Sequence, residues 1–160
     1  MKTIVVLSDT HGSKKGIEAL LPIIKENDYV VHLGDGATEF GVLLEANPKG
    51  FYFCSGNCDF WEDCPKEGIL AVEGIKIFYC HGHKYGVKTG LERLASRAKS
   101  LGCSVALYGH THLARVDEIE GITLVCPGSL RAPKDKGGSY AYIVVAGEKV
   151  TTALVGENPR

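Results

Sequence analysis

The stretch TIVVLSDTH, residues 3–11, contains the two features on which the fold prediction rests. Its first part, residues 3–7, is a near-continuous apolar and β-branched run of strand length. Because the run has no polar alternation, we expect a strand that is buried on both faces. Its second part places Asp9 and His11 just past that strand, where polar side chains can gather at one edge of a sheet.

Four further runs have the same apolar character and are expected to form buried strands. They comprise residues 29–33, 51–54, 75–80 and 104–108. After these runs the pattern of predicted elements changes to successive strands. These strands are expected at residues 114–119, 122–125, 140–145 and 149–155. Glu120-Gly121 and Gly147-Glu148 are tight-turn signals that join two pairs of these later strands. Residues 134–138 are rich in Lys and Gly and are expected to form a loop.

Three helices are expected from apolar spacing and from their end signals. The first follows Ser13 as its N-cap, and Pro22 should break or kink it. Thr38 is expected to cap the second helix. The third begins at a capping box over residues 89–92, with Gly102 as its C-terminal cap. Strands and helices that alternate first and a strand meander that follows predict an α/β fold of two facing sheets with helices outside.

Length and composition limit the classes of protein to consider. The 160 residues are expected to form one domain, 1–160. The formal net charge is −1, with 18 Lys and Arg against 19 Asp and Glu and no block of like charge, so no electrostatic footprint for nucleic acid is visible. The N-terminal apolar run is too short for a signal peptide, and no run suits a membrane span. A cytoplasmic protein with six reduced cysteines is therefore expected.

Seven metal-type side chains occur in five small clusters, each just past one of the five buried strands. Taken singly, each cluster also suits an ordinary turn or loop. Taken together, two carboxylates, four imidazoles and one amide oxygen suit a pair of divalent first-row metals. Asp35 lies between two glycines, where it is either a turn residue or a carboxylate that bridges two ions. The seven residues are Asp9, His11, Asp35, Asn57, His81, His110 and His112.

In order and spacing, these motifs resemble those of the calcineurin-like metallophosphoesterases, in particular the small branch of bacterial and archaeal phosphodiesterases. The matching motifs are Asp9-Thr10-His11, Gly34-Asp35, Gly56-Asn57-Cys58-Asp59, His81-Gly82, Gly109-His110-Thr111-His112 and Pro127-Gly128-Ser129. The resemblance implies a four-layer αββα sandwich, with two mixed sheets flanked by helices, and a two-metal centre. By position, Asp9, His11, Asp35 and His112 would hold the first metal. Asp35, Asn57, His81 and His110 would hold the second, with Asp35 as the bridge.

The sequence departs from the larger family's pattern at two positions. Cys58 occupies the place where that family has a His credited with protonating the leaving group. Cys126 precedes the Pro-Gly-Ser motif, where the small branch commonly has Asn. The thiol of Cys58 is a weak hydrogen-bond donor, so a dependence on the quality of the leaving group is expected. Arg131 follows the same motif and is a candidate for binding a phosphate oxygen.

The expected activity is hydrolysis of a small phosphoester, more specifically a diester, by a hydroxide that bridges two divalent metals. Manganese is the expected ion, and iron, zinc, nickel and cobalt suit the same donors. Asp35 and Asn57 are expected to take part directly, whereas Asp59 and His83 would orient ligands or substrate. The alternative is a protein-interaction scaffold of the same fold, as in the related retromer subunit, or a regulatory domain with vestigial activity. The oligomeric state stays open, a homo-oligomer included.

Overall fold

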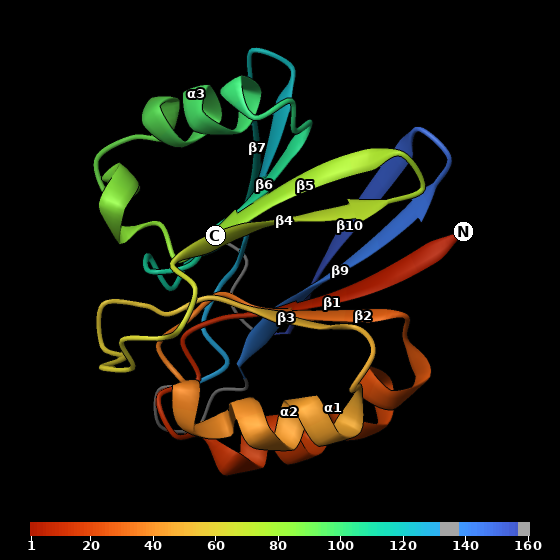
Figure 1. Ribbon diagram of the computed structural model, residues 1–160, viewed down its shortest axis with the longest axis vertical. Coiled ribbons are helices and arrows are strands. Elements are labelled where there is room, and N and C mark those ends of the chain that lie inside the picture. The colour runs from red at the N-terminus through yellow and green to blue at the C-terminus, as the bar shows by residue number, and fades with distance from the viewer. Residues whose placement is uncertain (132–137, 157–160) are drawn as a thin grey trace.

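The computed structural model describes residues 1–131 and 138–156, which form two five-stranded sheets packed face to face (Figure 1). The first sheet has the order β10-β9-β1-β2-β3. Strands β1, β2 and β3 are parallel, and β9 pairs antiparallel with both β1 and β10. The strands span Lys2–Leu7 (β1), Tyr29–His32 (β2), Phe51–Phe53 (β3), Ser139–Ala146 (β9) and Lys149–Gly156 (β10).

The second sheet has the order β4-β5-β6-β8-β7. Strands β5, β6 and β8 are parallel, whereas the edge strands β4 and β7 run antiparallel to their neighbours. The strands span Glu67–Val72 (β4), Ile75–Cys80 (β5), Val105–Leu107 (β6), Ala114–Ile119 (β7) and Ile122–Pro127 (β8). Both sheets are therefore mixed.

Helices cover the outer face of each sheet (Figure 1). The helices α1 (Lys14–Glu26) and α2 (Phe40–Ala46) pack on the first sheet, and α3 (Glu92–Ser100) packs on the second. Short 3-10 turns occupy Ala37–Glu39 (η1) and His83–Tyr85 (η2). The four layers confirm the predicted αββα sandwich.

Strand β1 shows why an unbroken apolar run predicts a central strand. Ile4 and Val6 lie in the core between the sheets, whereas Val5 and Leu7 pack against α1. All four side chains are fully buried, and each contributes roughly 1.5–3 kcal/mol by leaving water. Both faces of the strand are thus covered, as predicted.

The predicted strands are all present, but β4 is absent from the prediction. Its residues alternate between exposed and buried along the edge of the sheet, unlike the continuous apolar runs of the central strands. Its two-residue turn to β5, Glu73-Gly74, has positive φ at both residues. Glu120-Gly121 forms the same kind of turn between β7 and β8, so the dipeptide is the signal that could have located β4.

Three details of the helix prediction are wrong. Helix α1 runs through Pro22, so the predicted break is wrong, whereas a kink stays a prediction; Pro22 faces solvent, and Ile17, Leu20 and Ile24 bury the opposite stripe. Thr38 lies inside η1, and α2 follows with no side-chain cap. Residues 89–92 form no capping box, because Thr89 donates its hydroxyl hydrogen bond to the carbonyl of Gly86 instead.

The predictions for two other helix ends are confirmed. Ser13 occupies the N-cap position of α1, although its side chain makes no capping hydrogen bond. Gly102 follows α3 with φ +71°, which suits a glycine at a helix end.

All six cysteines are free thiols, as predicted. The loop expected at residues 134–138 lies almost wholly outside the described residues.

Candidate metal centre

The structure brings the seven metal-type side chains together at one end of the sandwich. They lie in the loops that follow β1, β2, β3, β5 and β6, all of which run parallel to a neighbour. These five strands are not consecutive, because β4 intervenes and carries no such side chain. The donor atoms form two groups, and within each group they all lie within 4.8 Å of one another. The first group consists of Asp9, His11 and His112, and the second consists of Asp35, His81 and His110. The Oδ1 atom of Asn57 lies 3.0 Å from Nε2 of His81.

The backbone of these loops is unusual. In the part of the chain that the structure describes, seven non-glycine residues have positive φ, and two of them are turn residues of hairpins. The other five are all candidate metal ligands: Asp9, His11, Asp35, His110 and His112. Left-handed backbone costs of order 1–3 kcal/mol per residue and persists where the surroundings hold it in place. Strain concentrated on these five residues indicates a functional site.

Glycines allow the loops after β2 and β3 to approach closely. A Cβ atom on Gly34 would overlap the backbone of Gly56. A Cβ atom on Gly56 would in turn overlap Oδ1 of Asp35. Any side chain at either position would therefore push Asp35 away from the loop that carries Asn57.

Asp35 lies between the two groups of donors. Its Oδ1 atom accepts a hydrogen bond from the backbone N–H of Cys58 at 2.8 Å. Its Oδ2 atom lies 3.3 Å from Nε2 of His81 and 3.9 Å from Nε2 of His11. Burial would raise the pKa of Asp35, but the hydrogen bonds from His81 and Cys58 and the neighbouring imidazoles hold it well below its usual range. The carboxylate is thus ionised and points at both groups, as a bridging ligand must.

His81 is oriented by the first sheet. Its Nδ1 atom lies 2.7 Å from the carbonyl oxygen of Leu33 and donates its hydrogen there. This leaves Nε2 as the free nitrogen, directed at Asp35 and Asn57. Burial lowers the pKa of His81, but the hydrogen bond to Asp35 and the charges of Asp9 and Asp35 raise it above its ordinary value.

Asp9 connects the two sheets through its buried carboxylate. Its Oδ1 atom lies 3.0 Å from Nε2 of His112, and its Oδ2 atom accepts from the backbone N–H of His110 at 3.0 Å. Burial would raise the pKa of Asp9, but the hydrogen bond with His112 and the charge of His81 lower it. The backbone of Asp9 is held in place by Ser129, whose hydroxyl donates to its carbonyl at 2.7 Å.

Asp59 anchors the loops around Asp35. Its carboxylate accepts hydrogen bonds from four backbone N–H groups, at distances of 2.7 to 3.0 Å. The donors belong to Asp35, Gly36, Ala37 and Gly56. Since its acceptor capacity is used in this way, Asp59 is placed to orient Asp35 rather than to contact a substrate.

A buried polar network beneath the site is absent from the sequence prediction. Nδ1 of His32 accepts from the N–H of Gly34 at 3.1 Å, so the ring hydrogen is on Nε2, 3.0 Å from the hydroxyl of Thr10. The Thr10 hydroxyl donates to Glu39 at 2.7 Å. Complete burial lowers the pKa of His32 to about 4, which keeps the ring neutral. The available signal was a histidine at the end of a buried strand, three residues before Asp35.

The remaining predicted residues lie near the centre but outside the two donor groups. The ring of His83 is 5.3 Å from that of His81, and its buried Nδ1 has no hydrogen-bond partner among the described residues. Cys126 is buried, with its Sγ atom 3.5 Å from the Thr111 hydroxyl, so it supports the loop between His110 and His112. Arg131 is exposed, and its proposed contact with phosphate stays a prediction.

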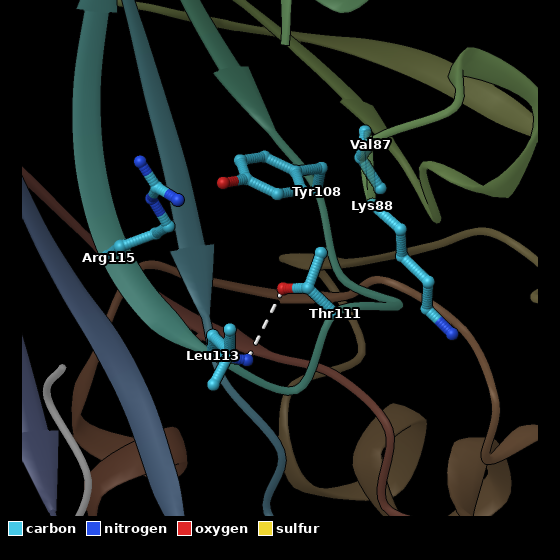
Figure 2. Close-up of a pocket in the computed structure, with 6 residues that line it drawn as sticks. All are labelled: Val87, Lys88, Tyr108, Thr111, Leu113 and Arg115. Carbon is cyan, nitrogen blue, oxygen red and sulfur yellow. Dashed lines mark hydrogen bonds between the residues drawn. The ribbon is translucent and has the colours of Figure 1, made fainter. Parts of the chain in front are cut away.

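Two hollows flank the site. One, of 260 Å³, opens beside Asp35 and is also lined by His11, Cys58 and the 95% exposed Phe60. The other, of 190 Å³, lies beside Thr111 and contains none of the seven metal-type side chains (Figure 2). Its lining consists of Val87, Lys88, Tyr108, Thr111, Leu113 and Arg115. Of the two hollows, the first is therefore the one that opens onto Asp35.

The donor set fits divalent cations. Nε2 of His11 is buried and has no hydrogen-bond partner among the described residues, although it lies 3.7 Å from the Asp9 carboxylate. A buried polar atom without a partner is costly, and a cation between these atoms would satisfy it. Imidazole and carboxylate together are typical of sites for first-row transition metals.

Residues 1–148 match the calcineurin-like phosphoesterase superfamily domain, and the chain belongs to this family. It is 30% identical to the probable metallophosphoesterase YsnB of Bacillus subtilis over 150 residues, which cover 92% of this chain and 87% of YsnB. It is 28% identical to the phosphodiesterase MJ0936 of Methanocaldococcus jannaschii over 143 residues, which cover 77% of this chain and 81% of that protein. A crystal structure of a predicted phosphoesterase from Streptococcus pneumoniae superposes with a TM-score of 0.79 at 25% identity, covering 97% of this chain and 89% of that one.

The family therefore confirms the resemblance that the motifs indicated, and it implies a divalent-metal phosphoesterase.

None of the helices in the described ranges has the length and apolarity needed to cross a membrane.

Proposed function

We propose that this chain is a binuclear metal-dependent phosphodiesterase. Asp9, His11, Asp35 and His112 would hold one cation, and Asp35, Asn57, His81 and His110 would hold the other. The observation that carries this proposal is the position of Asp35, whose Oδ2 atom lies within 3.9 Å of one imidazole from each group. The similarity to a named phosphodiesterase supports a phosphodiester as the substrate.

When bound, the two cations would supply an activated water and neutralise the charge on the phosphate oxygens. The chain's own groups would fix the geometry. Asp59 holds the backbone on both sides of Asp35, and the carbonyl of Leu33 fixes the ring of His81. The hollow lined by His11, Asp35 and Cys58 would admit the phosphate to the open side of the centre.

Protonation of the leaving group is the weak step of this site. Cys58 occupies the position next to Asn57, and burial together with the charge of the Asp35 carboxylate raises the pKa of its thiol. While it is not bound to a metal, the side chain is therefore a neutral thiol, which donates hydrogen bonds poorly. His83 is the nearest other imidazole outside the donor groups, and we propose that it contacts the substrate. Diesters with good leaving groups should be hydrolysed fastest.

Manganese is the ion that we propose for the active enzyme, and iron, zinc, nickel and cobalt suit the same donors. The test is a turnover assay of the metal-free protein reloaded with each ion in turn. It compares a nitrophenyl phosphodiester with the corresponding monoester. We expect hydrolysis that depends on the added ion and favours the diester. Two ions bound per chain with no hydrolysis of either ester would contradict the proposal and favour an interaction scaffold.

A further inference from the structure

A third group of donor atoms lies on the open side of the centre. It consists of His11, Asp35 and Cys58, whose donor atoms all lie within 4.8 Å of one another. Two of these residues belong to the ligand set proposed above, but Cys58 does not. Cys58 is also the one exposed cysteine of the six, since the others are buried.

Local contacts fix the position of Cys58 relative to the bridging carboxylate. Its backbone N–H donates to Oδ1 of Asp35 at 2.8 Å. Its Sγ atom accepts a hydrogen bond from the side-chain amide of Asn57 at 3.5 Å. The thiol lines the same hollow as His11 and Asp35. It therefore faces the side of the centre from which a substrate would approach.

The distances allow the thiol to reach a cation held by its neighbours. Sulfur and nitrogen ligands of one tetrahedral zinc ion lie about 3.6 Å apart, given bonds of about 2.3 and 2.1 Å. A contraction of about 1 Å from the 4.8 Å limit is within reach of a side-chain rotation at the exposed Cys58. Thiolate ligands select zinc and similar soft ions, whereas manganese prefers oxygen donors.

We propose that Cys58 is a metal-selective ligand: it binds a thiophilic ion such as Zn²⁺, Co²⁺ or Cd²⁺ that is held by His11 and Asp35, and it leaves Mn²⁺ alone. This inference rests on the proposed function, because it assumes an ion at the first group of donors. On binding, the sulfur–metal bond forms and the thiol proton leaves to solvent. The thiolate then occupies the side that the phosphate needs, so the zinc form should turn over more slowly than the manganese form.

Cobalt absorption spectra test the inference independently of activity. The metal-free protein is titrated with Co²⁺ as wild type, as Cys58→Ser and as the control Cys64→Ser, which changes a cysteine of the same loop outside the donor group. We expect a near-ultraviolet thiolate-to-cobalt band in the wild type and in Cys64→Ser, but not in Cys58→Ser. The visible cobalt bands should persist in all three proteins. Visible bands without the ultraviolet band in the wild type, or an ultraviolet band that survives Cys58→Ser, would overturn the inference alone. No visible bands in any protein would overturn the proposed function as well.

Metal affinities give a second and independent measurement. Loss of groups that only orient metal ligands costs about 10–100-fold in affinity, and loss of a direct ligand should cost no less. Cys58→Ser should therefore weaken Zn²⁺ binding by at least about tenfold and leave Mn²⁺ binding nearly unchanged. The variant should also release one proton fewer per zinc ion bound. Equal weakening for both ions would show that Cys58 acts only through the loop structure, and the inference would be wrong.

Discussion

The two sheets contribute different chemistry to the candidate centre. The loops after β1, β2 and β3 supply every oxygen donor, namely Asp9, Asp35 and Asn57, together with His11. The loops after β5 and β6 supply only imidazoles, His81, His110 and His112. Neither sheet alone carries all the proposed ligands of either cation. The centre therefore exists only when the two sheets pack against each other.

The two contributions are also held in different ways. Asp35 is fixed from within the first sheet by Asp59 and by the backbone of Cys58. The imidazoles of the second sheet are oriented across the interface, by the carbonyl of Leu33 and the carboxylate of Asp9. The interface is apolar between the sheets and polar at this end. Removal of Asp35, which belongs to both proposed ligand sets, should therefore disturb both cations, whereas removal of a second-sheet group that is no ligand should disturb neither.

The largest effect is expected for Asp35→Asn. The amide keeps the shape of the side chain but removes the charge that both groups of donors face, so binding of two ions should fail. Loss of the cations' contribution of several kcal/mol should lower turnover of the diester by more than about a hundredfold. Metal content and turnover are measured on the same sample. A variant that keeps both ions and full turnover would remove Asp35 from the centre.

A large loss of stability is expected for Asp59→Ala. The substitution leaves four backbone N–H groups around Asp35 without their acceptor. Hydrogen bonds to charged groups contribute about 1.5–3 kcal/mol each, so the free energy of unfolding should fall by about 3 kcal/mol or more. Denaturant unfolding measures this change. Asp63→Ala, on the exposed part of the same loop, is the control, and equal losses in the two variants would refute the anchoring role.

His32 should make the stability of the first sheet dependent on pH. Burial lowers the pKa of His32 to about 4, against an ordinary value of 6.5 in the unfolded chain. Its contribution is therefore complete above pH 6.5 and is lost as the pH falls toward 4, because the unfolded chain takes up the proton first. Between pH 6.5 and 5 the free energy of unfolding should fall by about 1.6 kcal/mol. In His32→Gln this part of the slope should be absent. If the slope in His32→Gln is unchanged, titrating groups other than His32 cause the pH dependence of the free energy of unfolding.

The smallest effect is expected for Glu67→Gln on β4, which lies opposite Cys80 of β5 and contributes no metal-type side chain. Glu67 pairs with Arg97 at 2.8 Å, and both side chains are partly exposed. Exposed ion pairs contribute little to stability, so the unfolding midpoint should move less than in Asp59→Ala. Metal binding should be unchanged. A loss of metal in this variant would show that the centre depends on the whole second sheet rather than on the loops.

Much of this arrangement could be predicted from the sequence. The runs that form β1 and β2 and most of β5 are apolar because both faces of these strands are covered, and this pattern is local. Polar residues just past such strands could then be assigned to one end of the fold. Strand β4 was missed because Glu73-Gly74, the turn that joins it to β5, was not used as a hairpin signal. The helix break predicted at Pro22 was wrong, because a proline inside a helix can be tolerated when its neighbours bury a stripe of apolar side chains.

The supporting contacts could not be predicted, because they join residues far apart in the chain. The carboxylate of Asp59 accepts from backbone groups up to 24 positions away. His32 and Thr10 are 22 positions apart, and their pairing depends on the register between β1 and β2. Side chains whose partners are backbone atoms leave no pattern of residue types. Such contacts can be identified only when the positions and register of the strands are known.

Whether Asp35 bridges two cations is best tested by the number of divalent ions bound per chain, measured together with turnover of a phosphodiester. Metal-free protein is titrated with Mn²⁺, and bound ions and rate are recorded at each step. A centre bridged by Asp35 should bind two ions per chain and reach its full rate only with the second ion. Full turnover with one ion bound, or with none, would contradict a centre that is bridged by Asp35.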